Sequence, residues 1–259
     1  MLNNKDIKLI RALQQKKYRQ KYNYFVVEGE KMCYEVLKFF PRRLVSLFCL
    51  KDFYEKYKDD IDKTHVRVEI ITEKQLKGLS AMKSPNAAIA IVQIPEKKDI
   101  IDIEPSTDKA VLFLDRIQDP GNMGTIIRTC DWFGIKDVIV SPGTVDIYNP
   151  KVVQASMGSV MRIQVYEGDF QHVRNTLKNT FSFYATLLEG SNVFEERFDF
   201  PMVLVVGNES KGVSGVIAGN MDKHITIPGK NTGSDSLNVA VATGITLSCI
   251  MKEQSKSLG

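Results

Sequence analysis

Three short loops carry the residues of this chain that are best suited to chemistry. Each loop follows an apolar run of strand length; the loops and runs are 119–124 after 111–115, 207–212 after 203–206, and 229–238 after 224–228. The loops and the residues just beyond them hold amide, carboxylate, hydroxyl and guanidinium groups: Asn122, Arg128, Glu209, Ser236 and Asn238. Glycines among them let backbone amides approach a ligand closely. The pattern predicts a ligand-binding site built from loops.

The apolar runs that precede these loops indicate the fold. Apolar segments alternate with helical stretches in the C-terminal part, at 111–114, 137–140, 183–186, 203–206 and 225–227. This alternation is typical of an α/β domain with a mostly parallel sheet and helices on both faces. Such sheets bind ligands at the carboxyl ends of their strands, which is where the three loops would gather.

The loops, in their order and spacing, resemble the three motifs of a known family. The motifs are Asn122-x-Gly124-x-x-x-Arg128; Gly207-Asn208-Glu209 with Gly212; and Ile227-Pro228 leading to Ser236-Leu237-Asn238-Val239. They resemble the SpoU (TrmH) family of S-adenosylmethionine-dependent RNA 2′-O-ribose methyltransferases, within the SPOUT superfamily. Segments 148–153 and 155–159 resemble the family's connecting segment. Segments 25–29 and 82–85 resemble the substrate-binding domain carried by a subset of members.

The resemblance implies a set of site residues and a cofactor. The implied catalytic residues are Asn122, Arg128, Glu209, Ser236 and Asn238. Those implied to bind S-adenosylmethionine are Thr186, Gly207, Asn208, Glu209, Ile227, Ser236 and Leu237. It also implies a C-terminal trefoil knot and a homodimer whose active sites form near the subunit interface.

Arg128 has two possible roles under this resemblance, besides a plain surface position. A ribose 2′-hydroxyl must lose its proton during methylation, and an arginine that stays protonated stabilises the developing alkoxide and clamps substrate phosphate. In the family the matching arginine is also described as the base, which would require a severe environmental shift of its pKa. The plain alternative is that Asn122 caps the next helix, Gly134 ends it, and Arg128 lies on its solvated face.

The other polar loop residues have similar alternatives. Glu209 is either a first-turn carboxylate that favours a helix dipole, or a group that organises the site and orients Arg128 or the substrate. Ser236 and Asn238 are either helix caps or substrate-positioning groups. The third motif departs from the family pattern, which has methionine after Ile-Pro and a shorter loop, so the cofactor contacts of 229–235 stay open.

The N-terminal part carries most of the evidence for an anionic partner. The chain has 259 residues, 43% of them hydrophobic, which is enough for two ordinary domains. Its net charge of +4 is a mild basic excess that is compatible with an anionic partner. Basic residues and tyrosines interleave between positions 5 and 24, a composition suited to phosphate contacts and base stacking. The residues expected to bind RNA are Lys16, Lys17, Arg19, Lys21, Lys83 and Lys151. For any one of the basic residues between positions 5 and 21, a solvated helix face is an equally good explanation.

We expect two domains joined by a connector. Residues 1–95 form a smaller α/β RNA-binding domain resembling a ribosomal-protein fold, and its α/β block begins near Phe25. Proline and dense charge mark 96–108 as an exposed linker, and 109–259 form the methyltransferase domain.

Several other classes of protein are disfavoured. The four cysteines and three histidines lack disulfide or metal-ligand spacing, so no metal is expected. No apolar segment is long enough to cross a bilayer or to act as a signal core, which favours a cytoplasmic protein. The 207–214 loop places Lys211 before Gly212 and lacks a phosphate-loop signature, and 121–124 lacks that of a dinucleotide fold.

The function expected from the resemblance is S-adenosylmethionine-dependent methylation of a ribose 2′-hydroxyl in structured RNA, most simply ribosomal RNA. A tRNA methyltransferase and a non-catalytic RNA-binding or ribosome-assembly factor are the alternatives. The protein's sequence motifs do not specify which nucleotide is modified, because RNA is recognised through shape and unpaired loops. A housekeeping and an antibiotic-resistance role are equally compatible with the sequence.

Overall fold

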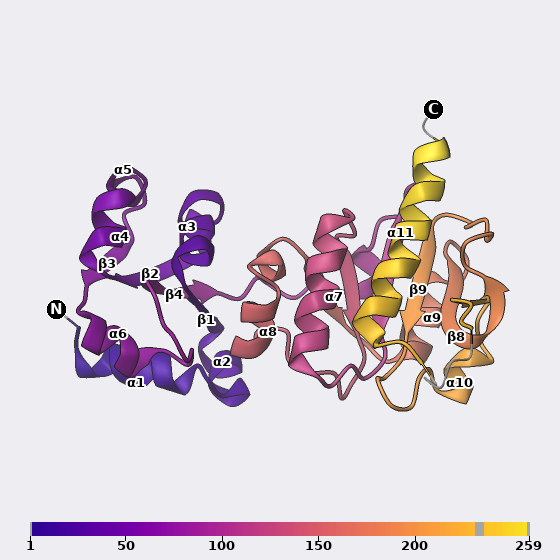
Figure 1. The fold of residues 1–259 in the computed structure, drawn as a ribbon, viewed down its shortest axis with the longest axis horizontal. Coiled ribbons are helices and arrows are strands. Elements are labelled where there is room, and N and C mark those ends of the chain that lie inside the picture. Colours follow the sequence, from indigo (N-terminus) through magenta and orange to yellow (C-terminus); the bar gives the residue numbers. More distant parts are fainter. Residues whose placement is uncertain (1, 231–235, 258–259) are drawn as a thin grey trace. The chain divides into compact units, whose positions relative to one another are not determined.

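The computed structural model describes residues 2–230 and 236–257, without the side chains of 254–257. The chain divides into two compact units (Figure 1). The first unit contains Met1–Glu96 and Asp146–Met161, and the second contains Lys97–Val145 and Arg162–Gly259. The segment Asp146–Met161 therefore packs with the N-terminal unit, although it lies between two parts of the other unit in sequence.

A four-stranded sheet forms the centre of the first unit. Its strands are β1 (Tyr24–Glu28), β2 (Leu44–Cys49), β3 (Arg67–Ile70) and β4 (Ala88–Gln93), in the order β1-β4-β2-β3. Strand β4 pairs antiparallel with both neighbours, whereas β2 and β3 are parallel. Strand β4 has five buried residues in a row because helices cover both of its faces.

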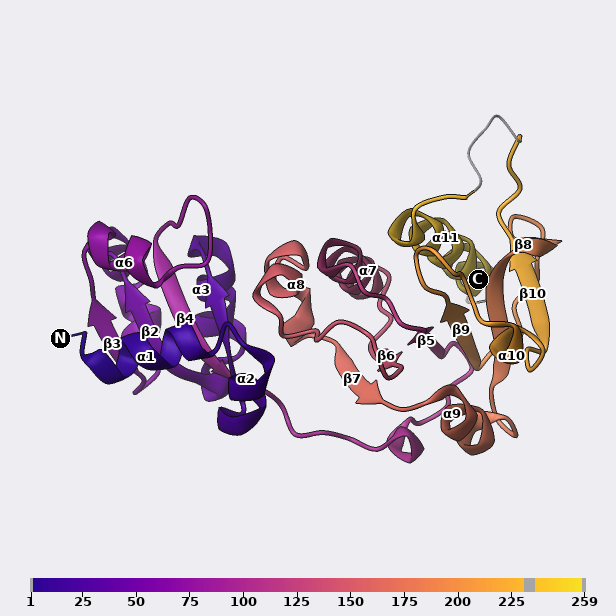
Figure 2. The same ribbon diagram turned by 90° about the horizontal axis from the view of Figure 1, so that it is seen from below.

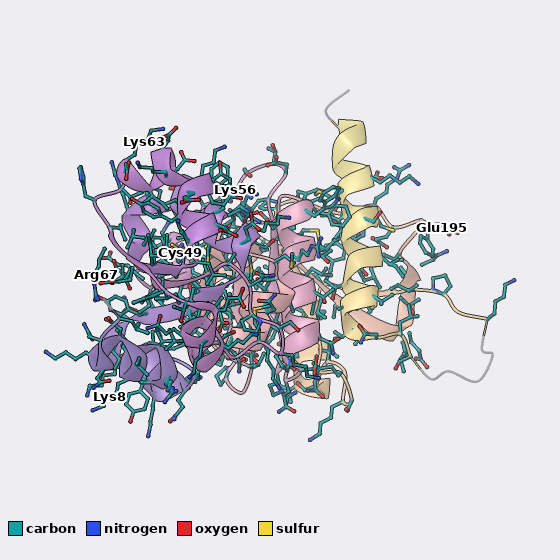
Figure 3. All side chains as sticks on the ribbon, turned by 60° about the vertical axis from the view of Figure 1, so that its left-hand side comes forward. Lys8, Cys49, Lys56, Lys63, Arg67 and Glu195 are labelled. Atoms are coloured by element: carbon teal, nitrogen blue, oxygen red, sulfur yellow. The ribbon has the colours of Figure 1, made fainter. Side chains whose placement is uncertain are left out.

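Helices surround this sheet. They are α1 (Asn4–Ala12), α2 (Lys16–Tyr22), α3 (Glu30–Phe39), α4 (Lys51–Lys56), α5 (Lys58–Asp62), α6 (Glu73–Leu79) and α8 (Pro150–Ala155), with 3-10 turns η1 (Pro41–Arg43) and η3 (Ser159–Met161). Helix α1 begins with a reciprocal capping box between Asn3 and Asp6. Figure 3 shows Cys49 enclosed by the elements of this unit and Lys8 projecting outward from α1.

Arg19 fastens the segment Asp146–Met161 to the rest of the first unit. Its Nε and Nη2 atoms donate to Oδ2 of Asp146 at 2.9 and 2.6 Å, and Nη1 donates to the carbonyl of Leu13 at 2.7 Å. The rings of Phe25 and Tyr148, whose centroids lie 4.8 Å apart, add a second contact between this segment and β1. Arg19 is only 2% exposed. The expectation that Arg19 binds RNA is therefore corrected: its guanidinium is buried and bonded inside the unit.

The second unit is built on a six-stranded sheet in which every pair of neighbours is parallel. Its strands are β5 (Ala110–Leu114), β6 (Asp137–Val140), β7 (Gln164–Glu167), β8 (Ser182–Asn192), β9 (Met202–Val206) and β10 (Lys223–Thr226), in the order β10-β8-β9-β5-β6-β7. The α/β fold with a mostly parallel sheet is thus confirmed. Strand β7 was not expected, because this edge strand is short and only Tyr166 of it is buried.

Helices lie on both faces of this sheet (Figure 2). They are α7 (Pro120–Trp132), α9 (Phe170–Leu177), α10 (Gly215–Ala218) and α11 (Val239–Ser257), preceded by the 3-10 turn η2 (Ile100–Asp102). Phe170 of α9 packs edge-on against Phe113 and Phe183, with ring centroids 5.7 and 6.2 Å away. On the other face α7 and α11 lie side by side. No helix in the described part of the chain is long and apolar enough to cross a membrane.

Candidate active site

The site lies where β5 and β9 end. These strands pair in register, with Leu114 opposite Val206, so the loops that follow them emerge next to each other. The first loop leads into α7, which Asp119 caps by accepting the backbone N–H of Asn122 at 2.7 Å. The third loop reaches the same place through the start of α11. Parallel pairing therefore converts three distant segments into one surface.

Glu209 is the hydrogen-bonding centre of this surface. Its Oε1 atom accepts the backbone N–H of Asp119 at 3.0 Å and that of Gln118 at 3.3 Å. The same atom accepts Nδ2 of Asn122 at 3.3 Å, and Oε2 accepts Nδ2 of Asn208 at 3.2 Å. A carboxylate that accepts several N–H groups fixes their positions strongly. Glu209 therefore holds the first loop against the second, and is not merely a first-turn charge.

Asn122 joins the second and third loops. It occupies the third residue of α7, so the helix cap expected as its plain role belongs instead to Asp119. While its Nδ2 donates to Glu209, its Oδ1 accepts Nδ2 of Asn238 at 2.9 Å. The Oδ1 atom of Asn238 accepts the backbone N–H of Ala240 at 2.9 Å, so Asn238 also caps α11. The helix-cap interpretation of Asn238 is therefore confirmed, and its role in positioning substrate stays a prediction.

Arg128 lies on an exposed stripe of α7. Helical spacing places Thr125, Arg128 and Trp132 on this stripe, and all three are exposed. Arg128 forms no hydrogen bond or ion pair with any residue in the described part of the chain. Glu209 bonds to loop amides and not to Arg128, so orientation of Arg128 by Glu209 is not seen here. The guanidinium is accordingly available to a ligand.

Gly207 is required by the loop itself. A Cβ atom at this position would lie 2.2 Å from the carbonyl carbon of Gly212, because the loop folds back on its own start. Asn208 fastens the fold by donating to the carbonyl of Arg116 at 2.7 Å and by accepting the amides of Ser210 and Lys211. The loop therefore requires glycine at this position for its own fold, and approach of the cofactor to Gly207 stays a prediction.

The remaining residues expected to bind the cofactor lie within β8, after β10 and just before α11. Thr186 is half-buried in β8, and its hydroxyl donates to the carbonyl of Val205 at 3.4 Å. Ile227 follows β10 and is half-buried, while Ser236 and Leu237 are exposed. Leu237 leaves 50% of its surface uncovered. Residues 231–235, part of the loop whose cofactor contacts were left open, lie outside the described residues.

Sequence reasoning missed a polar cluster under the first loop. Asp115 is buried and accepts Nε and Nη2 of Arg116 at 3.0 and 2.9 Å. The hydroxyl of Ser141 accepts the Arg116 backbone N–H at 2.9 Å. Arg116 has a φ of 55°, which is uncommon for a residue with a side chain. The only sequence signal was an aspartate directly after an apolar run.

The expected RNA-binding lysines are all exposed. Lys16, Lys17 and Lys21 project from α2, whereas Lys83 and Lys151 lie elsewhere on the first unit. On α2 the rings of Tyr18 and Tyr22 stack with centroids 6.3 Å apart. No group of three or more His, Cys, Asp or Glu residues suited to a metal ion occurs among residues 2–230 and 236–257.

A parallel α/β sheet with polar loops at the carboxyl ends of its strands defines a ligand-binding α/β domain. A family model identifies it: residues 109–248 match the SpoU rRNA Methylase family, and residues 4–90 match the MRM3-like substrate binding domain. The chain belongs to the SpoU rRNA methylase family. The family predicted from the three motifs is thereby confirmed.

Individual relatives agree over the whole length. The chain is 31% identical over 244 residues to the Bacillus subtilis 23S rRNA (guanosine(2553)-2'-O)-methyltransferase RlmP, covering 93% of this chain and 94% of the relative. A solved RNA methyltransferase of the TrmH family from Porphyromonas gingivalis superposes with a TM-score of 0.84 at 33% identity, covering 96% and 98% of the two chains. The structure of the AdoMet-bound rRNA methyltransferase from Sinorhizobium meliloti superposes with a TM-score of 0.85 at 30% identity. The match covers 97% of this chain and 96% of that chain.

Proposed function

We propose that this protein transfers a methyl group from S-adenosylmethionine to a ribose 2′-hydroxyl of ribosomal RNA. The observation that carries the proposal is the hydrogen-bonded series Glu209–Asn122–Asn238, which joins all three family motifs at one edge of the sheet. The relatives named above as rRNA methyltransferases support the substrate class.

The residues present fit the cofactor. Ile227 and Leu237 offer partly uncovered apolar surface for adenine, Gly207 and Asn208 follow the end of β9, and Thr186 lies within the neighbouring strand β8. When bound, S-adenosylmethionine supplies an electrophilic methyl group on a sulfonium sulfur. The Glu209 carboxylate favours this positive charge over the neutral product by Coulomb attraction, which eases product release.

Arg128 acts on the nucleophile. Its exposed guanidinium has no protein partner among the described residues, so it can bind an RNA phosphate and stabilise negative charge as the 2′-oxygen loses its proton. Because arginine stays protonated, we assign the electrostatic role and not that of the base. Asn122 and Ser236 position the ribose. Most of the rate enhancement comes from orientation and electrostatics.

The N-terminal part binds the RNA in this proposal. Residues 1–95 would grip structured RNA, 96–108 would link them to the methyltransferase domain 109–259, and the exposed Lys16, Lys17, Lys21, Lys83 and Lys151 would contact phosphates. The match to a substrate binding domain at residues 4–90 supports this division.

We further propose a homodimer, a C-terminal trefoil knot and a cytoplasmic location. Trp132 is 84% exposed on the same stripe of α7 as Arg128, so a partner subunit covering it would lie beside the catalytic cation. The knot is supported by the family and by α11, which returns from the β10 side of the sheet to pack against α7. Four free cysteines suit a reducing compartment.

The deciding experiment maps 2′-O-methyl nucleotides in total RNA by mass spectrometry. Three strains are compared: wild type, a strain lacking the gene, and an Arg128→Ala strain. One modification missing from both deficient strains would establish the activity and name its substrate. An unchanged profile, together with no binding of S-adenosylmethionine to the purified protein, would favour the non-catalytic RNA-binding factor. A missing modification in tRNA would identify tRNA as the substrate instead of rRNA.

A further inference from the structure

A cavity lies in the first unit. It is a cavity of about 310 Å³ formed by β1, the turn after α6 and helix α8. Val26, Glu28, Met82, Lys151, Val153 and Gln154 line it. All of these residues belong to the first unit, which also contains the domain matched as substrate binding. None of them belongs to the three catalytic loops.

Glu28 gives this cavity its chemistry. Its side chain is buried, with the residue 6% exposed, yet within the described part of the chain no lysine or arginine forms an ion pair with it. Its Oε2 accepts the hydroxyl of Ser80, and its Oε1 accepts the backbone N–H of Ala81 at 3.2 Å. A carboxylate has about four lone-pair positions, so about half of its accepting capacity stays open. Burying a charge is costly unless it gains further donors.

The rest of the wall suits a flat, aromatic ligand. Val26, Met82 and Val153 supply apolar surface, and the flexible thioether of Met82 adapts to the shape of what it contacts. The side-chain amide of Gln154 adds an NH2 group that donates and a carbonyl oxygen that accepts. Lys151 lines the cavity and is exposed, and Lys83 is exposed next to Met82, so positive charge lies near the opening. Apolar walls, a buried acceptor and nearby cations match a nucleotide.

We infer that this cavity binds an unpaired guanine of the RNA substrate, separate from the nucleotide that is methylated. Guanine presents two adjacent N–H donors, on N1 and N2, to the open side of one carboxylate. Adenine and cytosine place a ring acceptor beside their single amino group, and uracil flanks its N–H with two carbonyls, so each would set an acceptor against Glu28. Splayed-out bases read on this edge are a common way of recognising RNA. The inference rests on the proposed function, because it assigns the base that positions that substrate.

The first test detects the ligand without methyl transfer. The full chain is labelled with methyl-13C-methionine, the Met82 signal is assigned with Met82→Leu, and GMP, AMP, CMP and UMP are titrated separately. We expect GMP to shift the Met82 signal in a saturable manner. The GMP concentration needed should be at least about tenfold lower than for the other nucleotides, since one charged hydrogen bond gives about this difference in affinity. Glu28→Gln should abolish this preference while keeping the fold, because the oxygen of the introduced amide can accept the Ala81 N–H and its nitrogen can donate to Ser80.

The second test uses ribosomal RNA from a strain lacking the gene. Glu28→Gln should raise KM for RNA about tenfold with kcat and S-adenosylmethionine affinity unchanged. Ala81→Trp, which places bulk at the exposed edge of the cavity, should do the same and keeps the test valid if Glu28→Gln lowers stability. Glu55→Gln, an exposed glutamate of the same unit, is the control.

Two outcomes would overturn the inference: a Met82 signal indifferent to all four nucleotides, or wild-type KM in both cavity variants. Equal response to the four nucleotides would also reject the guanine assignment. If the wild-type protein transfers no methyl group to any rRNA, the proposed function fails. The GMP titration still tests independently whether the cavity binds guanine.

Discussion

The side-chain amide of Asn238 donates to Oδ1 of Asn122 at 2.9 Å, across 116 positions of sequence. Because Asn122 also donates to Glu209, this bond connects the start of α11 to the loops after β5 and β9. Two of the three residues have a local structural task as well: Asn238 caps a helix, and Glu209 binds backbone amides. The side chains predicted to act in catalysis therefore also make the hydrogen bonds that hold the loops together.

Replacement of Glu209 by glutamine should lower kcat about 100-fold, the scale of losing a preorganised electrostatic group. The two oxygens of the Glu209 carboxylate accept the backbone amides of Gln118 and Asp119 and two asparagine side chains. Glutamine has only one accepting oxygen, so some of these hydrogen bonds would be lost. Transfer of labelled methyl groups to rRNA measures the effect. Glu195→Gln, an exposed glutamate on the same unit, serves as control and should retain full activity. Unchanged turnover in Glu209→Gln would contradict the organising role.

Substitution of Arg128 by alanine should reduce kcat by about 100- to 1,000-fold and leave thermal stability unchanged. The side chain is exposed and has no partner in the described part of the chain, so its removal breaks no folding contact. Single-turnover assays and a thermal melt measure the two quantities. Arg197→Ala provides an exposed arginine of the same unit for comparison. A large drop in melting temperature would mean that Arg128 acts structurally.

Changing Lys16, Lys17 and Lys21 together to alanine should weaken RNA binding and flatten its salt dependence. Each lysine that contacts a phosphate contributes about 0.7 to 0.9 to the slope of log K against log salt, so the triple variant should lose about 2. Filter binding at several salt concentrations measures the slope. A matched triple variant removes the exposed Lys51, Lys58 and Lys63 of α4, α5 and the turn after it. Equal losses in both variants would show only a general charge effect.

Asp6 should make folding sensitive to acid. Its two oxygens accept Nη1 and Nη2 of Arg67 at 2.8 and 2.7 Å, and this hydrogen bonding lowers the pKa of Asp6 below its usual value of 3.8. A lowered folded-state pKa adds stability that is fully present above the unfolded pKa and is lost as pH falls through the folded pKa.

The Asp6→Asn variant should accordingly have a lower free energy of unfolding than wild type at pH 7. The difference should be only about 1 kcal/mol, because Arg67 is partly exposed and solvent screens the ion pair. The difference should shrink below about pH 4 as the wild-type carboxylate takes up its proton. Urea denaturation between pH 7 and 2 measures it. Asp60→Asn breaks an exposed pair at 3.8 Å and should change little. A difference independent of pH would refute the linkage.

The cysteines should react in an order set by burial. Burial raises the pKa of Cys33 and Cys130 strongly and that of Cys49 to about 11, and partial burial also raises that of Cys249. Because the thiolate is the reactive form, iodoacetamide at pH 8 should modify Cys249 first and the others only after unfolding. Peptide mass spectrometry follows each site. Early modification of Cys130 in the native protein would contradict its burial on the inner face of α7.

The strands of the parallel sheet were predictable because buried parallel strands leave continuous apolar runs. The run Asp137–Val140 matches β6, and the run at 203–206 lies inside β9. Strand β7 was missed because an edge strand needs less apolar sequence. Helices α1 and α2 were expected only as the alternative to RNA contacts, because basic residues outnumber apolar ones such as the buried Ile10 and Leu13 between positions 5 and 21.

Sequence alone determined the family, the parallel α/β fold and the polar residues of the three loops, because these depend on residue type and on spacing along the chain. Only the tertiary structure decided which of those residues touch. It gave the cap of α7 to Asp119, buried Arg19 against Asp146, and joined Asn122 to Asn238. Such contacts depend on strand pairing and on the packing of remote segments, which bring together atoms that linear spacing does not relate.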